Sequence, residues 1–292
     1  MNLSAVSLLL ITLISWPALA QNKPAATELS PDQIRALVRQ VADKDIENDK
    51  KQNEYTYIQR DEEHKLDGKG AVKSSQSKTQ EIMVLYGEQV QRLIAKDDKP
   101  LSEKDAAKEE ERIQKLTDKR KNETAEQRKK RMETEEKDRE DARKFVGEVA
   151  DAYNFRLIGM ENLDGRETYV IDAEPRPDFQ PHSKEAKVLP KFRFRAWIDR
   201  AESQWVKLDA ECIDTVSVGW FLARIHQGSR LLIDQTRVND EVWLPRHLAI
   251  KVDVRVALLK NFNLEADVTY RDYKKFRTDT KIVPVGELQE EH

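Results

Sequence analysis

The stretch HLAIKVDVRVALL, residues 247–259, holds the clearest structural signal in this sequence. From position 250 onward its side chains alternate strictly between apolar and charged, and the apolar members are Ile250, Val252, Val254 and Val256. Successive side chains of a β-strand point to opposite faces of a sheet, so the alternation predicts a strand with one apolar and one wet face. The rest of the sequence must supply what the apolar face contacts.

Other segments repeat this alternation and are separated by short turns. The segments KFRFRAWID, residues 191–199, and NFNLEADVTYRDY, residues 261–273, both alternate apolar and polar side chains. Asp164-Gly165 and Asn239-Asp240 are dipeptides typical of tight turns. Roughly ten such strands joined mostly by short turns predict one antiparallel meander.

Two amphipathic helices are predicted to accompany the sheet. Residues 29–41, LSPDQIRALVRQV, begin with Ser30 as an N-cap and Gln33 completing a capping box. Apolar side chains then recur at helical spacing, at Ile34, Leu37, Val38 and Val41. Residues 145–155 carry a second stripe, at Phe145, Val149 and Tyr153. The predicted fold is therefore α+β, with the apolar sheet face closing on itself or on these helices.

Residues 101–144 interrupt the strands with a segment that has almost no apolar side chains. Glu repeatedly precedes Lys or Arg by four residues, an order that stabilises a helix by about 0.2 to 0.5 kcal/mol per pair. Ser102 with Asp105 and Thr124 with Gln127 are two candidate capping boxes, so the segment is predicted to be a charged helical hairpin. We expect the hairpin to be exposed to solvent and the sheet to fold without it.

The overall charge argues against nucleic acid as a partner. The chain has 51 basic and 54 acidic side chains, a formal net charge of -3, and therefore no field that would attract a polyanion. The base-rich run 128–131 is neutralised by neighbouring acids, which is typical of a solvated helix. With 36% charged and 38% hydrophobic residues, the apolar side chains must be concentrated in one part of the fold.

The first twenty residues predict export. They contain an apolar run of secretory-signal length and end in Ala18-Leu19-Ala20, an A-x-A cleavage pattern, so the mature chain is expected to start at Gln21. An uncleaved membrane anchor is the alternative, but the run is short for a span. The single cysteine, Cys212, is far from the cleavage site, so lipidation there is not expected. We expect a periplasmic protein with at most peripheral or transient membrane contact, whose domain runs over 21–277 and ends in a flexible tail over 278–292.

Four hairpin motifs resemble a known superfamily. They are the W-I-D turn at 197–199, the W-V-K segment at 205–207, V-W-L-P at 242–245 and Y-R-D-Y at 270–273. Together they resemble the outer-membrane lipoprotein-sorting superfamily, with its LolA/LolB-like and RseB-like members, over about residues 30–277. The resemblance implies a half-open antiparallel β-barrel whose mouth is covered by helices and whose apolar cavity holds acyl chains. The charged hairpin departs from the usual carriers.

Two groups of residues are candidates for lining such a cavity. The first is Trp220, Phe221 and Leu222, three consecutive large apolar residues that make both faces of a strand apolar. The second is the apolar face of the opening stretch and the next strand, at Ile250, Val252, Val254, Phe262 and Leu264. An ordinary packed core is the alternative interpretation of both groups.

No constellation for catalysis or cofactor binding is visible. The five histidines are scattered, and the sequence has no nucleophile elbow, zinc-protease motif or glycine-rich phosphate loop. The cluster DEEH, residues 61–64, is more typical of a solvated strand than of a metal site. The sequence therefore predicts no enzyme, no cofactor and no metal. Two functions stay open: a carrier or chaperone for lipid or lipoprotein acyl chains, and an envelope interaction or stress-sensing protein that binds a protein partner through residues 101–144.

Overall fold

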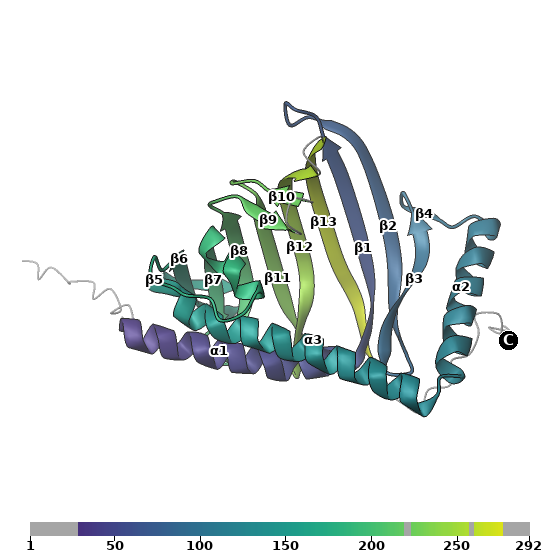
Figure 1. The fold of residues 1–292 in the computed structure, drawn as a ribbon, viewed down its shortest axis with the longest axis horizontal. Coiled ribbons are helices and arrows are strands. Elements are labelled where there is room, and N and C mark those ends of the chain that lie inside the picture. The colour runs from purple at the N-terminus through teal and green to yellow at the C-terminus, as the bar shows by residue number, and fades with distance from the viewer. Residues whose placement is uncertain (1–28, 219–222, 257–259, 277–292) are drawn as a thin grey trace, which may run out of the picture.

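The computed structural model describes residues 29–218, 223–256 and 260–276. The predicted signal peptide over 1–20 and the predicted tail over 278–292 lie outside the described residues. Helices run across one end of a large curved sheet (Figure 1).

The described residues form a sheet of 13 strands, and every pairing among them is antiparallel. The strands are β1 (Tyr55–Leu66), β2 (Val72–Leu85), β3 (Glu88–Lys96), β4 (Lys99–Pro100), β5 (Tyr153–Leu163), β6 (Arg166–Pro175), β7 (Phe192–Asp199), β8 (Gln204–Cys212), β9 (Val216–Val218), β10 (Ala223–Ile225), β11 (Arg230–Val238), β12 (Val242–Val256) and β13 (Lys260–Lys275). Their order is β4-β3-β2-β1-β13-β12-β11-β8-β7-β6-β5, with β9 and β10 attached beside β12. The described strands form an open sheet, because its two edge strands, β4 and β5, do not pair with each other. An antiparallel sheet together with separate helices confirms the predicted α+β class.

Three α-helices and one 3-10 helix complete the described fold. They are α1 (Pro31–Gln52), α2 (Glu103–Lys121), α3 (Ala125–Ala152) and η1 (Glu185–Lys191). The capping box of Ser30 and Gln33 starts α1, as predicted from the sequence. Figure 1 shows α1 and α3 side by side across the lower ends of the strands. Arg39 of α1 and Asp151 of α3 form an ion pair at 3.1 Å between the two helices.

The main apolar core lies between these helices and the β5–β8 end of the sheet. Ile34 and Val41 of α1 pack on Ile171, Ala196 and Ile198 of β6 and β7. A second cluster joins the end of α3 and the start of β5 to η1 and contains Ala152, Tyr153, Ala173, Ala186 and Leu189. We call the face of the sheet that carries both clusters the helix face, and the opposite face the outer face.

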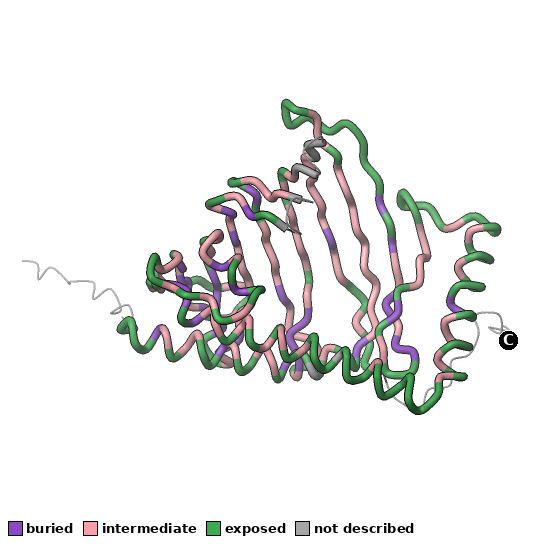
Figure 2. The backbone as a smooth tube through the Cα atoms, in the orientation of Figure 1, coloured by how far each residue is buried: buried purple, intermediate pink, exposed green. Residues whose placement is uncertain are grey.

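Residues 247–256 of the opening stretch belong to β12, and the apolar side chains of Ile250, Val252 and Val254 lie on the helix face. Ile250 is opposite Leu231 of β11, which is opposite Ala210 of β8, and directly opposite residues share a face. On the other side, Val252 is opposite Leu264 of β13. These apolar side chains are only half-buried, and Figure 2 shows the upper parts of β12 and β13 mostly as intermediate.

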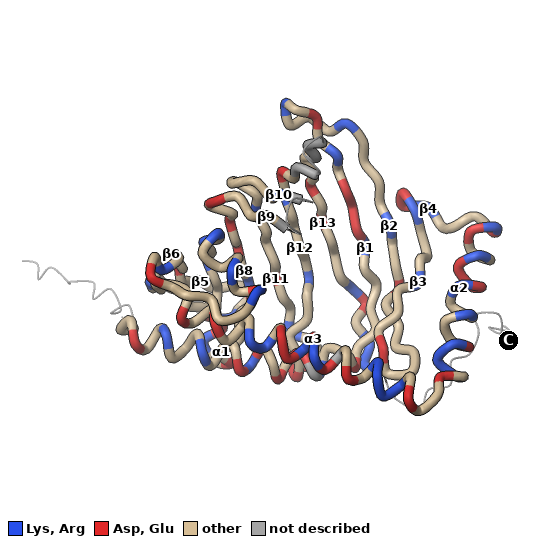
Figure 3. The backbone as a smooth tube through the Cα atoms, in the orientation of Figure 1, with Lys and Arg blue, Asp and Glu red and all other residues tan. Residues whose placement is uncertain are grey.

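The outer face carries charged pairs together with one apolar cluster, which consists of Val170, Trp197, Val206 and Trp243. Arg195 bonds Asp172 at 2.6 Å across β6 and β7, and Lys251 bonds Glu265 at 2.7 Å across β12 and β13. Figure 3 shows basic and acidic residues of both signs on these strands and, more densely, on α2 and α3. This pairing keeps the strands around it in contact with water on the outer face.

The predicted hairpin over residues 101–144 is not confirmed. Two helices form there, but α2 lies beside β3 while α3 turns away and continues along α1 (Figure 1). Ile113 of α2 is only 7% exposed because it packs on Leu85 and Val90. Arg120 and Arg131 both reach Glu88 at the start of β3, at 2.6 and 2.7 Å. Ile113, the partly buried Leu116 and this ionic cluster thus connect a helix that is otherwise charged to the sheet.

This contact gives a prediction opposite to the expectation that the segment is dispensable. Ile113→Ala should lower the free energy of unfolding by about 2 to 3 kcal/mol, because it removes buried methyl groups from a packed cluster. Glu110→Ala, at an exposed position of the same helix, should change it by less than about 0.5 kcal/mol. Urea denaturation of both variants measures the difference, and equal stabilities would show that α2 docks without contributing to folding.

Candidate functional site

An apolar cavity of about 390 Å³ lies between α1, α3 and the helix face of the sheet. Its lining residues come from both helices, from η1 and the following residues, and from five strands: Val38, Val41, Ala42, Asp45, Phe145, Val146, Val149, Tyr153, Phe155, Ile171, Val188, Leu189, Phe192, Phe194, Ala196, Ile198, Trp205, Leu208, Ala210 and Leu231. Asp45 is the one charged residue among these described lining residues. The cavity therefore offers a hydrocarbon surface with a single ionisable group that can carry a charge at neutral pH.

The sizes of the facing side chains explain why space remains there. Ala42 on α1 and Ala196 and Ala210 on the strands are small residues among larger neighbours in the lining. Rings bound the cavity near the end of α3, where Tyr153 and Phe194 stand edge to face with centroids 4.7 Å apart. Small side chains between rigid rings leave a volume that the neighbouring side chains do not fill.

The polar groups of the lining have partners within the protein. The Tyr153 hydroxyl donates to the carbonyl of Leu189 at 2.7 Å, and burial raises the pKa of this tyrosine. The Trp205 indole N–H donates to Oδ1 of Asp45 at 2.7 Å, and the Gln204 amide donates to the same oxygen at 3.4 Å. Burial raises the pKa of Asp45, although these hydrogen bonds act in the opposite direction.

Four of the residues proposed from the sequence are described, and they lie on strands beside this cavity. Ile250, Val252, Val254 and Leu264 share the helix face of β12 and β13, in register with one another. The described lining reaches Leu231, which is directly opposite Ile250, so this apolar strip begins where the cavity ends. Trp220, Phe221 and Leu222 lie outside the described residues, as does the side chain of Phe262.

None of the candidate cavity residues from the sequence is in this described lining, although part of the signal for the lining is present in the sequence. Asp45 follows Val38 and Val41 by seven and four residues, so it continues the apolar stripe of α1. A carboxylate on an apolar stripe is unusual and marks a position that faces the interior. The contributions of β5 to β8 could not be found in this way, because the alternation shows which residues face inward but not where a helix covers them.

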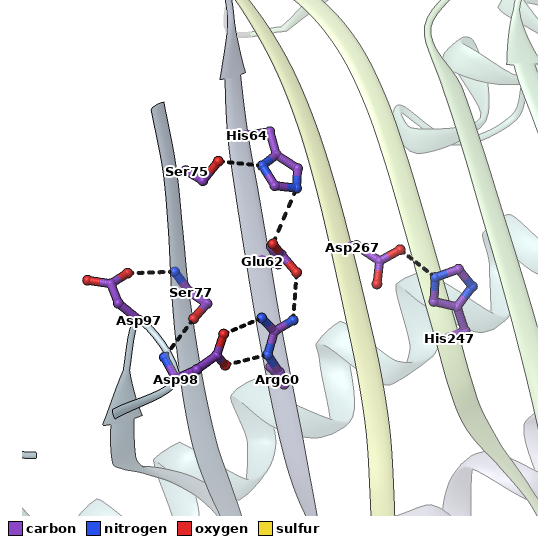
Figure 4. A network of polar contacts seen from close by, with 9 residues as sticks. All are labelled: Arg60, Glu62, His64, Ser75, Ser77, Asp97, Asp98, His247 and Asp267. Carbon is purple, nitrogen blue, oxygen red and sulfur yellow. Dashed lines mark hydrogen bonds and ion pairs between the residues drawn. The ribbon is translucent and has the colours of Figure 1, made fainter. Parts of the chain in front are cut away.

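Polar contacts that do not belong to the cavity lie on the outer face, around Arg60 of β1 and around His247 of β12 (Figure 4). Arg60 bonds both carboxylate oxygens of Asp98 at 2.7 and 2.8 Å and also reaches Glu62, and this pairing lowers the pKa of Asp98. His247 bonds Asp267 at 2.7 Å, and this contact raises the pKa of the imidazole. Across 29–218, 223–256 and 260–276, no group of three or more His, Cys, Asp or Glu is arranged to hold a metal ion.

No helix in the described part of the chain combines the length and the apolar character needed to cross a bilayer.

Comparisons with known proteins return solved structures. No family model and no curated protein matches the sequence. An outer membrane lipoprotein-sorting protein domain from Vibrio parahaemolyticus is 12% identical, with a TM-score of 0.32, over 82% of this chain and 95% of that one. A LolA superfamily protein from Nitrosomonas europaea is 8% identical, with a TM-score of 0.27, over 86% and 94%. MucB in complex with MucA is 10% identical, with a TM-score of 0.24, over 83% and 98%.

The superfamily that the hairpin motifs resemble is thus among the structural matches.

The position of Asp45 predicts a pH dependence of stability. A carboxyl group whose pKa is raised by folding favours the folded state only while it is protonated, so its contribution is lost as the pH rises from its ordinary value of 3.8 through the raised pKa. Asp45→Asn keeps an oxygen for the Trp205 N–H and removes the charge. The variant should therefore gain stability relative to the unmodified protein as the pH rises through this window.

Denaturant unfolding of both proteins over a pH series measures this difference. Asp43→Asn, at an exposed position of the same helix, is the matched control and should show no such trend. A difference that shrinks with rising pH would mean that Trp205 and Gln204 stabilise the carboxylate more than burial destabilises it.

Proposed function

We propose that this protein is an exported, non-enzymatic carrier or chaperone that holds the acyl chains of a lipid or lipoprotein in the cavity beneath α1 and α3. The observation that carries the proposal is the lining itself, in which nineteen of twenty residues are uncharged and nearly all are hydrocarbon or aromatic. Such a surface binds ligands by excluding water and provides almost no polar group that would select a hydrophilic ligand.

The size of the cavity supports an acyl chain as the ligand. Its volume of about 390 Å³ lies in the range of roughly 300 to 1,000 Å³ that is typical of small-molecule sites. Each methylene group removed from water contributes about 0.8 kcal/mol, so a chain of about ten methylenes gains on the order of 8 kcal/mol. A ligand of this kind needs an enclosed carrier to cross an aqueous compartment.

The composition of the first twenty residues supports export as part of this proposal. The apolar run and A-x-A pattern of residues 1–20 support export and a mature chain that begins at Gln21. A protein that works between two membranes would contact each of them transiently while it loads and unloads its cargo. The proposal therefore includes peripheral membrane contact and a periplasmic location.

The apolar strip on β12 and β13 extends the same proposal. Ile250 is directly opposite Leu231 at the border of the cavity, and Val252 and Leu264 continue the strip away from the helices. A chain longer than the cavity would lie along this strip, where the sheet face is half-exposed. We include Val254, Phe262 and the segment 220–222 in this proposed extension on sequence grounds.

A cavity-filling substitution tests the central claim. Ala42→Phe places a ring in the cavity and should weaken the binding of a fluorescent fatty acid at least about tenfold, since it displaces the equivalent of two or more methylene groups. Ala36→Phe makes the same change at an exposed position of α1 and should bind normally. Thermal unfolding of both variants checks that the fold is retained.

The unmodified protein decides between the two open functions. If it takes up no acyl probe after delipidation, the carrier proposal fails. A protein partner captured by the intact chain and lost when residues 103–121 are replaced would then favour the envelope interaction protein.

A second substitution separates the cavity from the strip. Val252→Asp introduces a carboxylate into the half-exposed apolar strip and should weaken a long-chain probe while leaving a short-chain probe, which fits within the cavity, unaffected. Ala249→Asp puts the same charge on the outer face of β12 and serves as the control. Competition binding with probes of increasing chain length measures the effect, and equal loss for both lengths would contradict a two-part site.

A further inference from the structure

The two edges of the open sheet differ in how they are protected. The edge at β4 is a strand of two residues, Lys99 and Pro100, and the neighbouring β3 is flanked by α2. Short edge strands, lysine and proline all prevent another strand from pairing. The opposite edge, β5, has eleven residues without lysine or proline, and among the described strands it pairs only with β6. Its outer row of backbone groups is therefore available to a further strand.

The side chains of β5 also indicate a partner. Five large apolar side chains are exposed among the described residues, and two of them, Ile158 at 41% and Met160 at 37%, lie on this edge. A bulge at Ile158 divides the strand, since the register with β6 shifts between Leu157 and Gly159. Before the bulge, the even-numbered residues lie on the outer face, as the bond from Arg156 to Asp172 shows. After the bulge, the odd-numbered residues lie on the outer face, as the bond from Trp197 to Glu161 shows.

We propose that β5 pairs with β5 of a second copy of this chain, in antiparallel register, with the twofold axis between Ile158 and Gly159. In this register Arg156 is opposite Glu161 of the second copy, and Leu157 is opposite Met160, each pair occurring twice by symmetry. Both members of each pair lie on the same sheet face, because the bulge reverses the alternation between the two halves of the strand.

Neighbouring registers lack this complementarity. Sliding the second copy by two residues places Arg156 opposite Gly159 or Leu163, and sliding it by one residue places an outward residue opposite an inward one. The Arg156 side chain is 77% exposed and holds Asp172 at 3.3 Å, so it can turn toward a partner strand without leaving a buried charge. Charge complementarity therefore selects one self-pairing of this edge.

Charge reversal tests the pairing. Arg156→Glu and Glu161→Arg each place like charges opposite one another twice in a homodimer, and each should weaken dimerisation about tenfold or more. An equimolar mixture of the two variants should restore it, because every pair in the mixed dimer again joins opposite charges. Sedimentation over a concentration series measures all three.

A further substitution keeps the test independent of the Trp197 contact of Glu161. Ile158→Lys puts a lysine at the centre of the exposed edge and should give a folded monomer, as judged by an unchanged melting temperature. It replaces the charge-reversal pair if Glu161→Arg does not fold. An unmodified protein that is monomeric at its highest soluble concentration, a mixture that does not recover, or a dimer unaffected by Ile158→Lys would each overturn the proposal.

Discussion

The helix face of the open sheet is larger than the area that two helices can cover, and the rest of the structure depends on this constraint. One buried contact sets where the cover lies: the side-chain amide of Asn48 in α1 donates to the carbonyl of Trp243 at 2.6 Å and accepts from its N–H at 2.8 Å. This contact attaches the helix to the first residues of β12 and satisfies two backbone groups that would otherwise be buried without partners. The helices therefore cross the lower ends of the strands, and the upper part of the face stays half-exposed.

The high charge content of the sequence is related to this open sheet, because many of the charged side chains lie on its outer face. Cross-strand pairs such as Arg195 with Asp172 and Lys251 with Glu265 cover the outer face. Each exposed pair contributes little stability, about 0 to 1 kcal/mol, but together the pairs keep one face of a broad sheet hydrated. The helix face thus carries the apolar cavity, and the outer face carries, besides its charged pairs, an apolar cluster of Val170, Trp197, Val206 and Trp243.

The helices and strands can be predicted from the sequence because caps and side-chain alternation depend on residues that are close together in the chain. Alternation at Val252 and Leu264 predicts two strands that the structure pairs in register, and the capping boxes at Ser30 and Thr124 both form. The docking of α2 could not be predicted, because it depends on Ile113, whose partners Leu85 and Val90 are distant in the sequence. The cavity is missed for the same reason: its volume is set by where α1 crosses the strands.

The difference between the cavity and the strip shows what the helices add to the sheet. Leu231 and Ile250 are directly opposite one another on the same face, yet only Leu231 is among the residues that line the cavity, which α1 and α3 cover. An apolar surface that helices cover can contact a ligand from more than one side, whereas a half-exposed apolar strip can contact only one side of it. Asp45 lies on the side of α1 that lines the cavity, and burial there makes ionisation of its carboxyl group unfavourable. The position of α1 thus determines both the volume of the cavity and the ionisable group that faces it.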